Sequence, residues 1–123
     1  MTPENFVNAL KVQTSDAAVR GTVAQLRAPS GRKPDPKLVM LSEWFNELSS
    51  SDQEHVTEVI RQAAQLAVFG FFCVLDGVTV FEDGPNKGDL KLIYSNRSET
   101  LVLNNPQVEF LHDIYNSKCE DSV

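Results

Sequence analysis

Hydrophobic residues follow two different periods along this chain. Up to residue 75 they recur every three or four positions, the spacing of one face of an α-helix, whereas after residue 77 they form short alternating segments between turn residues. The two regions meet at an apolar run, residues 66–75, which is followed by Asp76 and Gly77. The pattern predicts a single α+β domain over residues 1–123, with N-terminal helices and with this run buried in a long central helix.

Polar capping residues mark the starts of the predicted helices. A threonine, aspartate or asparagine directly before proline is typical of a helix start, because its side chain accepts an orphan amide hydrogen and proline fits the first turn. Ser51 and Glu54 have the spacing of a capping box, which would open the longest helix. The polar segment 14–16 leaves open whether the first helical region is two helices or one kinked helix. The cap-plus-proline pairs are Thr2-Pro3, Asp35-Pro36 and Asn105-Pro106.

The end of the longest helix has two interpretations. The helix either continues to Leu75 and ends at Gly77, which adopts the left-handed conformation readily, or it stops at Gly70. In the second case residues 71–75 would pair with residues 78–82 across an Asp-Gly turn. We favour the longer helix, whose small residues would let another element approach closely. These small residues are Ala63, Ala67 and Gly70.

Strand-type segments follow the longest helix. They alternate apolar and polar residues and are separated by turn residues, so they predict a three-stranded antiparallel meander with one face packed on the helices. A C-terminal helix would begin at Asn105-Pro106, and residues 117–123 would form a polar tail. The proline-rich segment 28–36 is expected to be an exposed loop. The predicted strands are residues 78–82, 90–95 and 99–103.

An apolar face is predicted on the helix that follows Pro36. Its residues recur at helical spacing, so we expect this face in the core or at an interface, with the tryptophan belonging to it. The residues of this face are Leu38, Leu41, Trp44, Phe45 and Leu48.

The net charge of −6 is distributed unevenly. Residues 1–37 carry six basic and three acidic side chains, whereas residues 38–123 carry five basic and fourteen acidic ones. This acidic majority disfavours nucleic acid and anionic membranes and favours a basic protein as partner. The apolar run is about half as long as the roughly 20 residues that cross a bilayer, and residues 1–5 do not resemble a secretion signal. We therefore expect a cytoplasmic protein that does not enter membranes.

The residues that could carry chemistry do not form a complete catalytic or metal-binding set. Glu109 and His112 have the spacing of a metal-binding pair, but a metal site would need further ligands, so we expect these two residues with Asp113 on a solvated helix face. Cys73 and Cys119 lack metal-ligand spacing and are expected to be free thiols. No cofactor or metal is predicted, which favours a protein that is not an enzyme.

The hypothesis that follows is a non-enzymatic, acidic protein-binding module, of the kind found in inhibitors and immunity proteins, acting on a basic partner. Acidic side chains bordering the exposed loops of the meander would provide steering charge for that partner. The residues placed at this binding surface are Glu82, Asp83, Asp89 and Glu99.

Two alternatives remain open. The first is a small-ligand binder or hydrolase with a pocket between the central helix and the sheet, lined by aromatic side chains. The second is a homodimer, formed through an unprotected edge of the meander or through the surface around Phe6 and Val7. The pocket of the first alternative would be lined by Trp44, Phe69, Phe72 and Tyr94.

Overall fold

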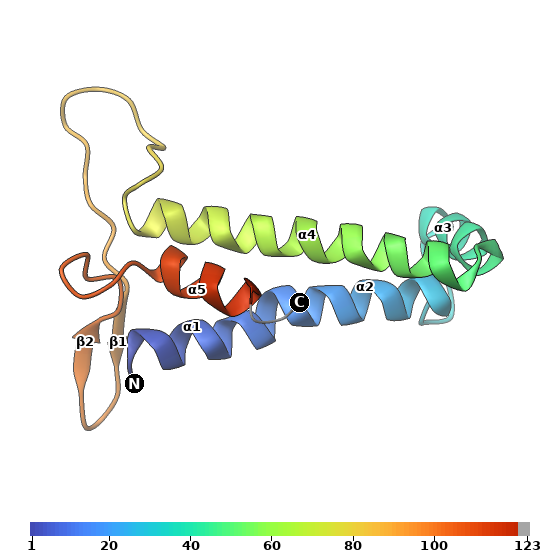
Figure 1. Ribbon diagram of the computed structural model, residues 1–123, viewed down its shortest axis with the longest axis horizontal. Coiled ribbons are helices and arrows are strands. Elements are labelled where there is room, and N and C mark those ends of the chain that lie inside the picture. Colours follow the sequence, from blue (N-terminus) through green and yellow to red (C-terminus); the bar gives the residue numbers. More distant parts are fainter. Residues whose placement is uncertain (121–123) are drawn as a thin grey trace.

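Long helices dominate the structure, a computed structural model that describes residues 1–120. Three consecutive helical segments form one rod, and α4 runs back beside this rod after the turn made by α3 (Figure 1). A short helix, α5, packs against both α1 and α4, and a small sheet lies at the end of the molecule opposite α3 (Figure 1). The elements are α1 (Pro3–Lys11), a π-helical segment η1 (Val12–Asp16), α2 (Ala17–Arg27), α3 (Pro36–Glu47), α4 (Ser50–Leu75), β1 (Ile93–Ser95), β2 (Thr100–Val102) and α5 (Leu111–Glu120).

The rod begins at its predicted cap and is one continuous helix. Thr2 Oγ1 accepts a hydrogen bond from the Asn5 amide at 3.1 Å, and the equivalent aspartate cap, Asp35, opens α3. At the polar segment 14–16 the hydroxyl groups of Thr14 and Ser15 donate to backbone carbonyls one turn earlier instead of capping a second helix. The helix absorbs this segment as η1, so the single-helix interpretation is the one observed.

The start of α4 differs from the predicted capping box. Its N-cap is Ser49, whose Oγ accepts a hydrogen bond from the Asp52 amide at 3.1 Å, so the prediction from Ser51 and Glu54 is wrong. With the helix starting at Ser50, the Gln53 side-chain amide donates to the Phe45 carbonyl in the last turn of α3 at 3.0 Å, a long-range contact that favours this start.

The length of α4 agrees with the favoured interpretation, but its burial does not. The helix continues to Leu75 and is terminated by Gly77 at φ +78°, so the hairpin over residues 71–75 is wrong. Of its 26 residues only Phe72 and Cys73 are buried, and the Leu66 side chain is 70% exposed. The prediction of a buried central helix is therefore wrong. The rod and α5 cover only one side of α4, and no sheet covers the other (Figure 1).

By length and composition α4 could also cross a membrane, and it is the one such helix within residues 1–120. A soluble core helix passes the same test, but there most of the helix is buried. Here only 11% of its most apolar 18-residue window is buried. A proposal for the function therefore has to account for the exposed apolar surface of α4.

The predicted three-stranded meander is also wrong, because β1 and β2 form a two-stranded antiparallel sheet in which Tyr94 pairs with Leu101. Residues 78–82 form no strand in the structure. Their first two amides, at Val78 and Thr79, donate to the Cys73 carbonyl at 3.0 and 3.2 Å. These hydrogen bonds wrap the chain around the end of α4, so the amides are not available for strand pairing.

The main core lies where α1, α4 and α5 meet. Its fully buried side chains include Phe72 and Tyr115, whose rings are 5.5 Å apart. The Tyr115 hydroxyl donates to Ser15 Oγ at 2.7 Å, which ties α5 to the π-helical segment. The buried members of this core are Val7, Phe72, Leu111, Ile114 and Tyr115.

The C-terminal helix begins later than predicted. Asn105 Oδ1 accepts a hydrogen bond from the Gln107 amide, but this closes a turn, and α5 starts only at Leu111. The helix then extends to Glu120 and takes in most of the expected tail. Residues 121–123 lie outside the described residues.

At the other end of the molecule, α3 packs against α2. Phe45 is fully buried there, as the predicted apolar face requires. Leu41 and Trp44, predicted on the same face, are about half exposed. The apolar face of α3 is therefore only partly in the core.

Candidate functional site

Large apolar side chains are exposed along α4. Val59, Leu66 and Phe71 have 68%, 70% and 60% of their surface exposed. Small residues lie between them in two adjacent rows of i, i+4 spacing, which form one continuous strip on the helix. We call this strip, formed by Val59, Ala63, Leu66, Ala67, Gly70 and Phe71, the exposed α4 face.

The small residues of this face are not explained by packing within the described residues 1–120. A Cβ atom added at Gly70 would meet no atom within 4 Å. Ala63 and Ala67 are exposed as well. The expectation that another element approaches closely here is therefore not met by any element within residues 1–120.

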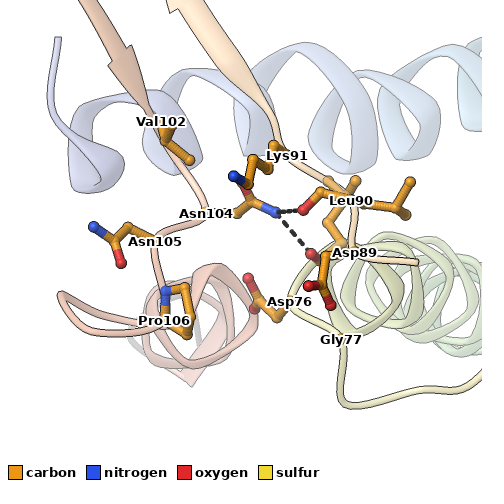
Figure 2. A pocket seen from close by; sticks show the side chains of 10 residues that line it. Asp76, Gly77, Asp89, Leu90, Lys91, Val102, Asn104, Asn105 and Pro106 are labelled. Atoms are coloured by element: carbon orange, nitrogen blue, oxygen red, sulfur yellow. Dashed lines mark hydrogen bonds between the residues drawn. The ribbon is translucent and has the colours of Figure 1, made fainter. Parts of the chain in front are cut away.

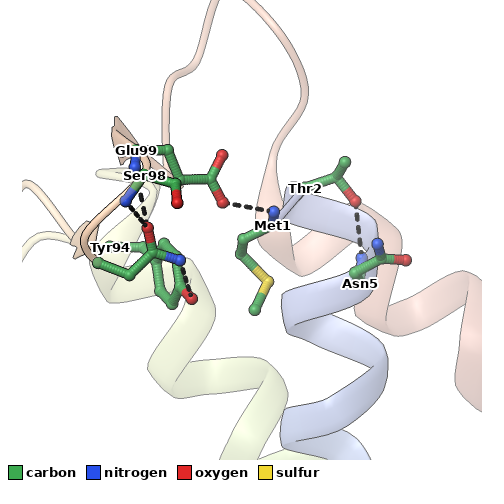
Figure 3. A network of polar contacts seen from close by, with 7 residues as sticks. Met1, Thr2, Asn5, Tyr94, Ser98 and Glu99 are labelled. Atoms are coloured by element: carbon green, nitrogen blue, oxygen red, sulfur yellow. Dashed lines mark hydrogen bonds and ion pairs between the residues drawn. The ribbon is translucent and has the colours of Figure 1, made fainter.

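Three of the four acidic residues predicted at a binding surface lie together in one loop. Glu82, Asp83 and Asp89 are exposed in the segment that joins α4 to β1, and Glu82 Oε1 accepts a hydrogen bond from the Gly88 amide. Glu99 lies in the turn between β1 and β2, and its carboxylate pairs with the amino group of Met1 at 2.7 Å (Figure 3). Glu99 therefore fixes the amino terminus to the hairpin and is less available to a partner.

The hairpin turn itself is held by a local network. Asn96 Oδ1 accepts hydrogen bonds from the amides of Ser98 and Glu99, and its side-chain nitrogen donates to the Tyr94 hydroxyl (Figure 3). The turn is thus closed by an asparagine side chain in the usual manner of an Asx turn.

The aromatic residues predicted to line a pocket are not brought together. Phe72 is in the core, and Phe69 packs on the ring of His112. Trp44 lies on α3 and Tyr94 on β1, at opposite ends of the molecule (Figure 1). The structure does not form a pocket from these side chains.

A buried polar cluster lies where α4 ends and α5 begins. The Asp76 side chain is fully buried, and its Oδ2 accepts hydrogen bonds from the His112 backbone amide at 2.8 Å and from His112 Nδ1 at 2.6 Å. The carboxylate caps the positive end of the α5 dipole and fixes the imidazole proton on Nδ1. The His112 ring is 14% exposed and packs against Phe69 and Phe110.

This arrangement corrects the placement of His112 on a solvated face. The sequence offers one local signal, an aspartate at the end of a helix directly before a glycine. The partner of that aspartate lies 36 residues further along the chain, and nothing in the sequence spacing indicates it.

Asn104 connects the end of α4 to the strand region. Its side-chain nitrogen donates to the carbonyls of Leu75 at 2.7 Å and Leu90 at 2.9 Å (Figure 2). Its Oδ1 accepts a hydrogen bond from the Leu92 amide at 2.8 Å. The Asn104 side chain therefore provides hydrogen-bond partners for three backbone groups that lie outside the two-stranded sheet. Asn104 is 5% exposed, and sequence analysis gave it no role.

A cavity of about 360 Å³ lies between these two polar groups. Its walls come from the end of α4, from the chain before β1 and from the segment after β2 (Figure 2). The carboxylate of Asp76 lies between Pro106 and Asp89 in this view. The lining residues are Leu75, Asp76, Gly77, Asp89, Leu90, Lys91, Val102, Asn104, Asn105 and Pro106.

The described residues offer little catalytic chemistry. No group of three or more potential metal ligands gathers within residues 1–120. Burial raises the pKa of the Cys73 thiol, and the carboxylates of Asp76 and Asp113 raise it further. Burial likewise raises the pKa of Cys119. Both thiols are therefore poor nucleophiles at neutral pH.

Comparisons with known proteins give no match. No protein-family model, curated protein or solved structure matches this chain. The function is therefore argued from the surfaces and side chains described above.

Proposed function

We propose that this chain is a non-enzymatic, acidic protein-binding module whose partner docks on the exposed α4 face. The observation that carries the proposal is the exposure of large apolar side chains along a helix of 26 residues. Contiguous apolar surface of this kind is typical of a binding site.

The free energy available on this face is substantial. Full burial of a Val, Leu or Phe side chain contributes about 1.5–3 kcal/mol. Val59, Leu66 and Phe71 keep 60–70% of their surface exposed, so a partner that covers them would gain roughly 1–2 kcal/mol from each. Three such side chains supply a central cluster, and the small residues between them let a partner helix approach closely.

A protein partner fits this face better than a lipid bilayer. The charge-free part of α4, residues 62–75, is 14 residues long, which corresponds to about 21 Å against a hydrocarbon core of about 30 Å. The other side of α4 contacts α2 and η1, and η1 carries Asp16, which pairs with Lys11 at the end of α1. A bilayer around α4 would have to accommodate these charges.

Charge complementarity favours a basic partner. Asp52 and Glu54 are exposed in the first turns of α4, before the exposed face, and Asp83 and Asp89 lie in the loop after its end. Together with the net charge of −6, they would steer and orient a positively charged protein. The partner that fits is an amphipathic helix with an apolar stripe and basic flanks, a common mode of peptide recognition.

A selection from a displayed library of random peptides tests the proposal. We expect the selected peptides to combine apolar residues at helical spacing with an excess of Lys and Arg, and their binding to weaken with salt. Leu66→Ser should reduce their affinity at least about tenfold. Val108→Ser is the matched control, because Val108 is 68% exposed but lies outside the α4 face.

Three results would contradict the proposal. Selected peptides without an excess of Lys and Arg would contradict the expected charge complementarity. Equal losses of affinity in Leu66→Ser and Val108→Ser would show that the peptides do not bind the exposed α4 face. Sedimentation that shows a dimer dissociated by Leu66→Ser would assign the face to a second copy of the chain. Such a dimer is the outcome that the homodimer alternative predicts.

A further inference from the structure

A second exposed apolar surface lies on α3, at the end of the molecule opposite the sheet (Figure 1). Met40, Leu41 and Trp44 are 69%, 51% and 49% exposed. Lys37 and Glu47 are exposed as well, and they extend the same surface toward the two ends of the helix, because residues three and four positions apart lie on one face. We call this surface, formed by Lys37, Met40, Leu41, Trp44 and Glu47, the α3 stripe.

The charges of the α3 stripe are not balanced within the described chain. Neither Lys37 nor Glu47 forms an ion pair within residues 1–120. Lys37 lies in the first turn of α3, and Glu47 is its last residue. This order opposes the helix dipole, which favours acidic groups at the start of a helix and basic groups at its end. The Asp35 cap supplies an acidic group at the start, but the last turn contains no basic residue.

Two copies of the α3 stripe complement each other when their helices run antiparallel. A twofold axis level with residue 42 places Lys37 opposite Glu47 of the second copy, and it makes this pair twice. The same register places Met40 opposite Trp44 of the second copy. Both pairs form in one register because the spacing is symmetric: steps of three, four and three residues separate Lys37, Met40, Trp44 and Glu47.

We propose that the α3 stripe is the contact surface of a homodimer in which the α3 helices of two copies pack antiparallel. The apolar side chains form the centre of this contact, and the pairs of Lys37 with Glu47 form its two ends. Tryptophan and methionine are enriched in the centres of protein interfaces. Each helix also receives from the second copy the charge that its own dipole favours at each end.

A second copy accounts for the α3 stripe better than a membrane does. An anionic bilayer would repel Glu47 within the stripe and the exposed Glu43 on the same helix, as well as the net charge of −6. An unrelated protein could cover the apolar side chains, but the symmetric spacing supplies a second copy with matching charges too. The contact does not use the exposed α4 face, so this inference goes beyond the proposed function and does not depend on it.

The size of this contact predicts a weak dimer. Helix α3 has 12 residues, which corresponds to a length of about 18 Å. A contact between two helices of this length belongs to the small interfaces that are typical of transient complexes. We therefore expect a reversible dimer that forms at concentrations between about 10 µM and about 1 mM.

Sedimentation equilibrium over this concentration range measures the dimerisation constant. Trp44 is the single tryptophan of the chain, so its fluorescence reports on the contact directly and should shift to shorter wavelength as the dimer forms. Trp44→Ser should weaken dimerisation at least about tenfold. Phe81→Ser is the matched control, because the Phe81 side chain is 61% exposed but lies in the loop after α4.

Charge reversal tests the antiparallel register. Lys37→Glu and Glu47→Lys each turn both ion pairs of the dimer into like-charge pairs, so each variant alone should weaken dimerisation about three- to tenfold. The double variant restores opposite charges and should return the dimerisation constant to within about twofold of its original value. Asp83→Lys makes the same change of charge as Glu47→Lys but in the loop after α4, and it should leave the dimer unchanged.

Several results would overturn this proposal. They are a monomer at about 1 mM, a double variant that does not restore the dimer, and equal losses in Trp44→Ser and Phe81→Ser. If Trp44→Ser changes the circular dichroism spectrum, the charge-reversal variants decide.

Two further outcomes would assign the surfaces differently. A fluorescence shift of Trp44 with vesicles of anionic phospholipid, but not with protein concentration, would overturn the dimer and assign the α3 stripe to a membrane. Leu66→Ser should leave the α3 dimer unchanged. A dimer that Leu66→Ser dissociates would lie on the exposed α4 face and would also overturn the proposal.

Discussion

Replacement of Asp76 by alanine tests the Asp76–His112 contact, which connects the end of α4 to the start of α5. The change removes two hydrogen bonds to a charged acceptor, at 2.6 and 2.8 Å, which contribute about 1.5–3 kcal/mol each. It also removes Oδ1, which is buried without a hydrogen-bond partner among the described residues and whose desolvation costs about 1–3 kcal/mol. The hydrogen bonds outweigh this cost, so we expect Asp76→Ala to lower the free energy of unfolding by about 2–4 kcal/mol.

Urea denaturation followed by circular dichroism measures this loss. His112→Phe keeps the ring packed between Phe69 and Phe110 and leaves the backbone hydrogen bond, so it should cost less, about 1–2 kcal/mol. The two losses should not add in the double variant, with a coupling energy of about 1–2 kcal/mol. If Asp76→Ala lowers the free energy of unfolding by less than about 0.5 kcal/mol, or if the losses of the two single variants add fully, the Asp76–His112 pair does not stabilise the contact between α4 and α5.

Two further predictions concern the core. Leu111→Ala should lower the free energy of unfolding by about 2–5 kcal/mol because Leu111 is fully buried, whereas Leu66→Ala should lower it by less than about 1 kcal/mol. Thermal denaturation measures both losses. Similar losses in the two variants would mean that Leu66 is buried. Burial raises the pKa of the Tyr115 hydroxyl well above its usual range, so the unfolded chain ionises first and stability should fall as the pH rises above about 10. In urea denaturation at successive pH values, Tyr115→Phe should reduce this loss of stability. A weaker loss should remain because the pKa values of Cys73 and Cys119 are also raised. An unchanged dependence of stability on pH would contradict the role of Tyr115.

Local signals in the sequence predicted the helices well. The cap at Thr2 and the cap at Asp35 are observed, as is the end of α4 before Gly77, because each depends on hydrogen bonds within a few residues. The capping box at Ser51 failed where two caps of similar quality compete. The observed cap is Ser49, and the contact between Gln53 and α3, which no local signal indicates, favours this start.

Predictions about which residues are buried, and by which elements, were less successful. An apolar run indicates burial only if enough other surface exists to cover it, and residues 78–82 do not supply the expected strand. The candidate site was missed for the same reason, since Asp76, Asn104 and His112 meet only after the chain has folded back.

The amino-acid sequence by itself determined the starts of α1 and α3 and the end of α4, because capping and period act over one or two turns, but it placed the start of α5 too early. It also set the acidic balance that favours a basic partner. Only the tertiary structure decided which side of α4 remains open to solvent and that the Asp76 carboxylate is buried against His112. Both depend on contacts between residues far apart in the chain, and such contacts are set by the packing of the whole molecule and leave no periodic signal in the sequence.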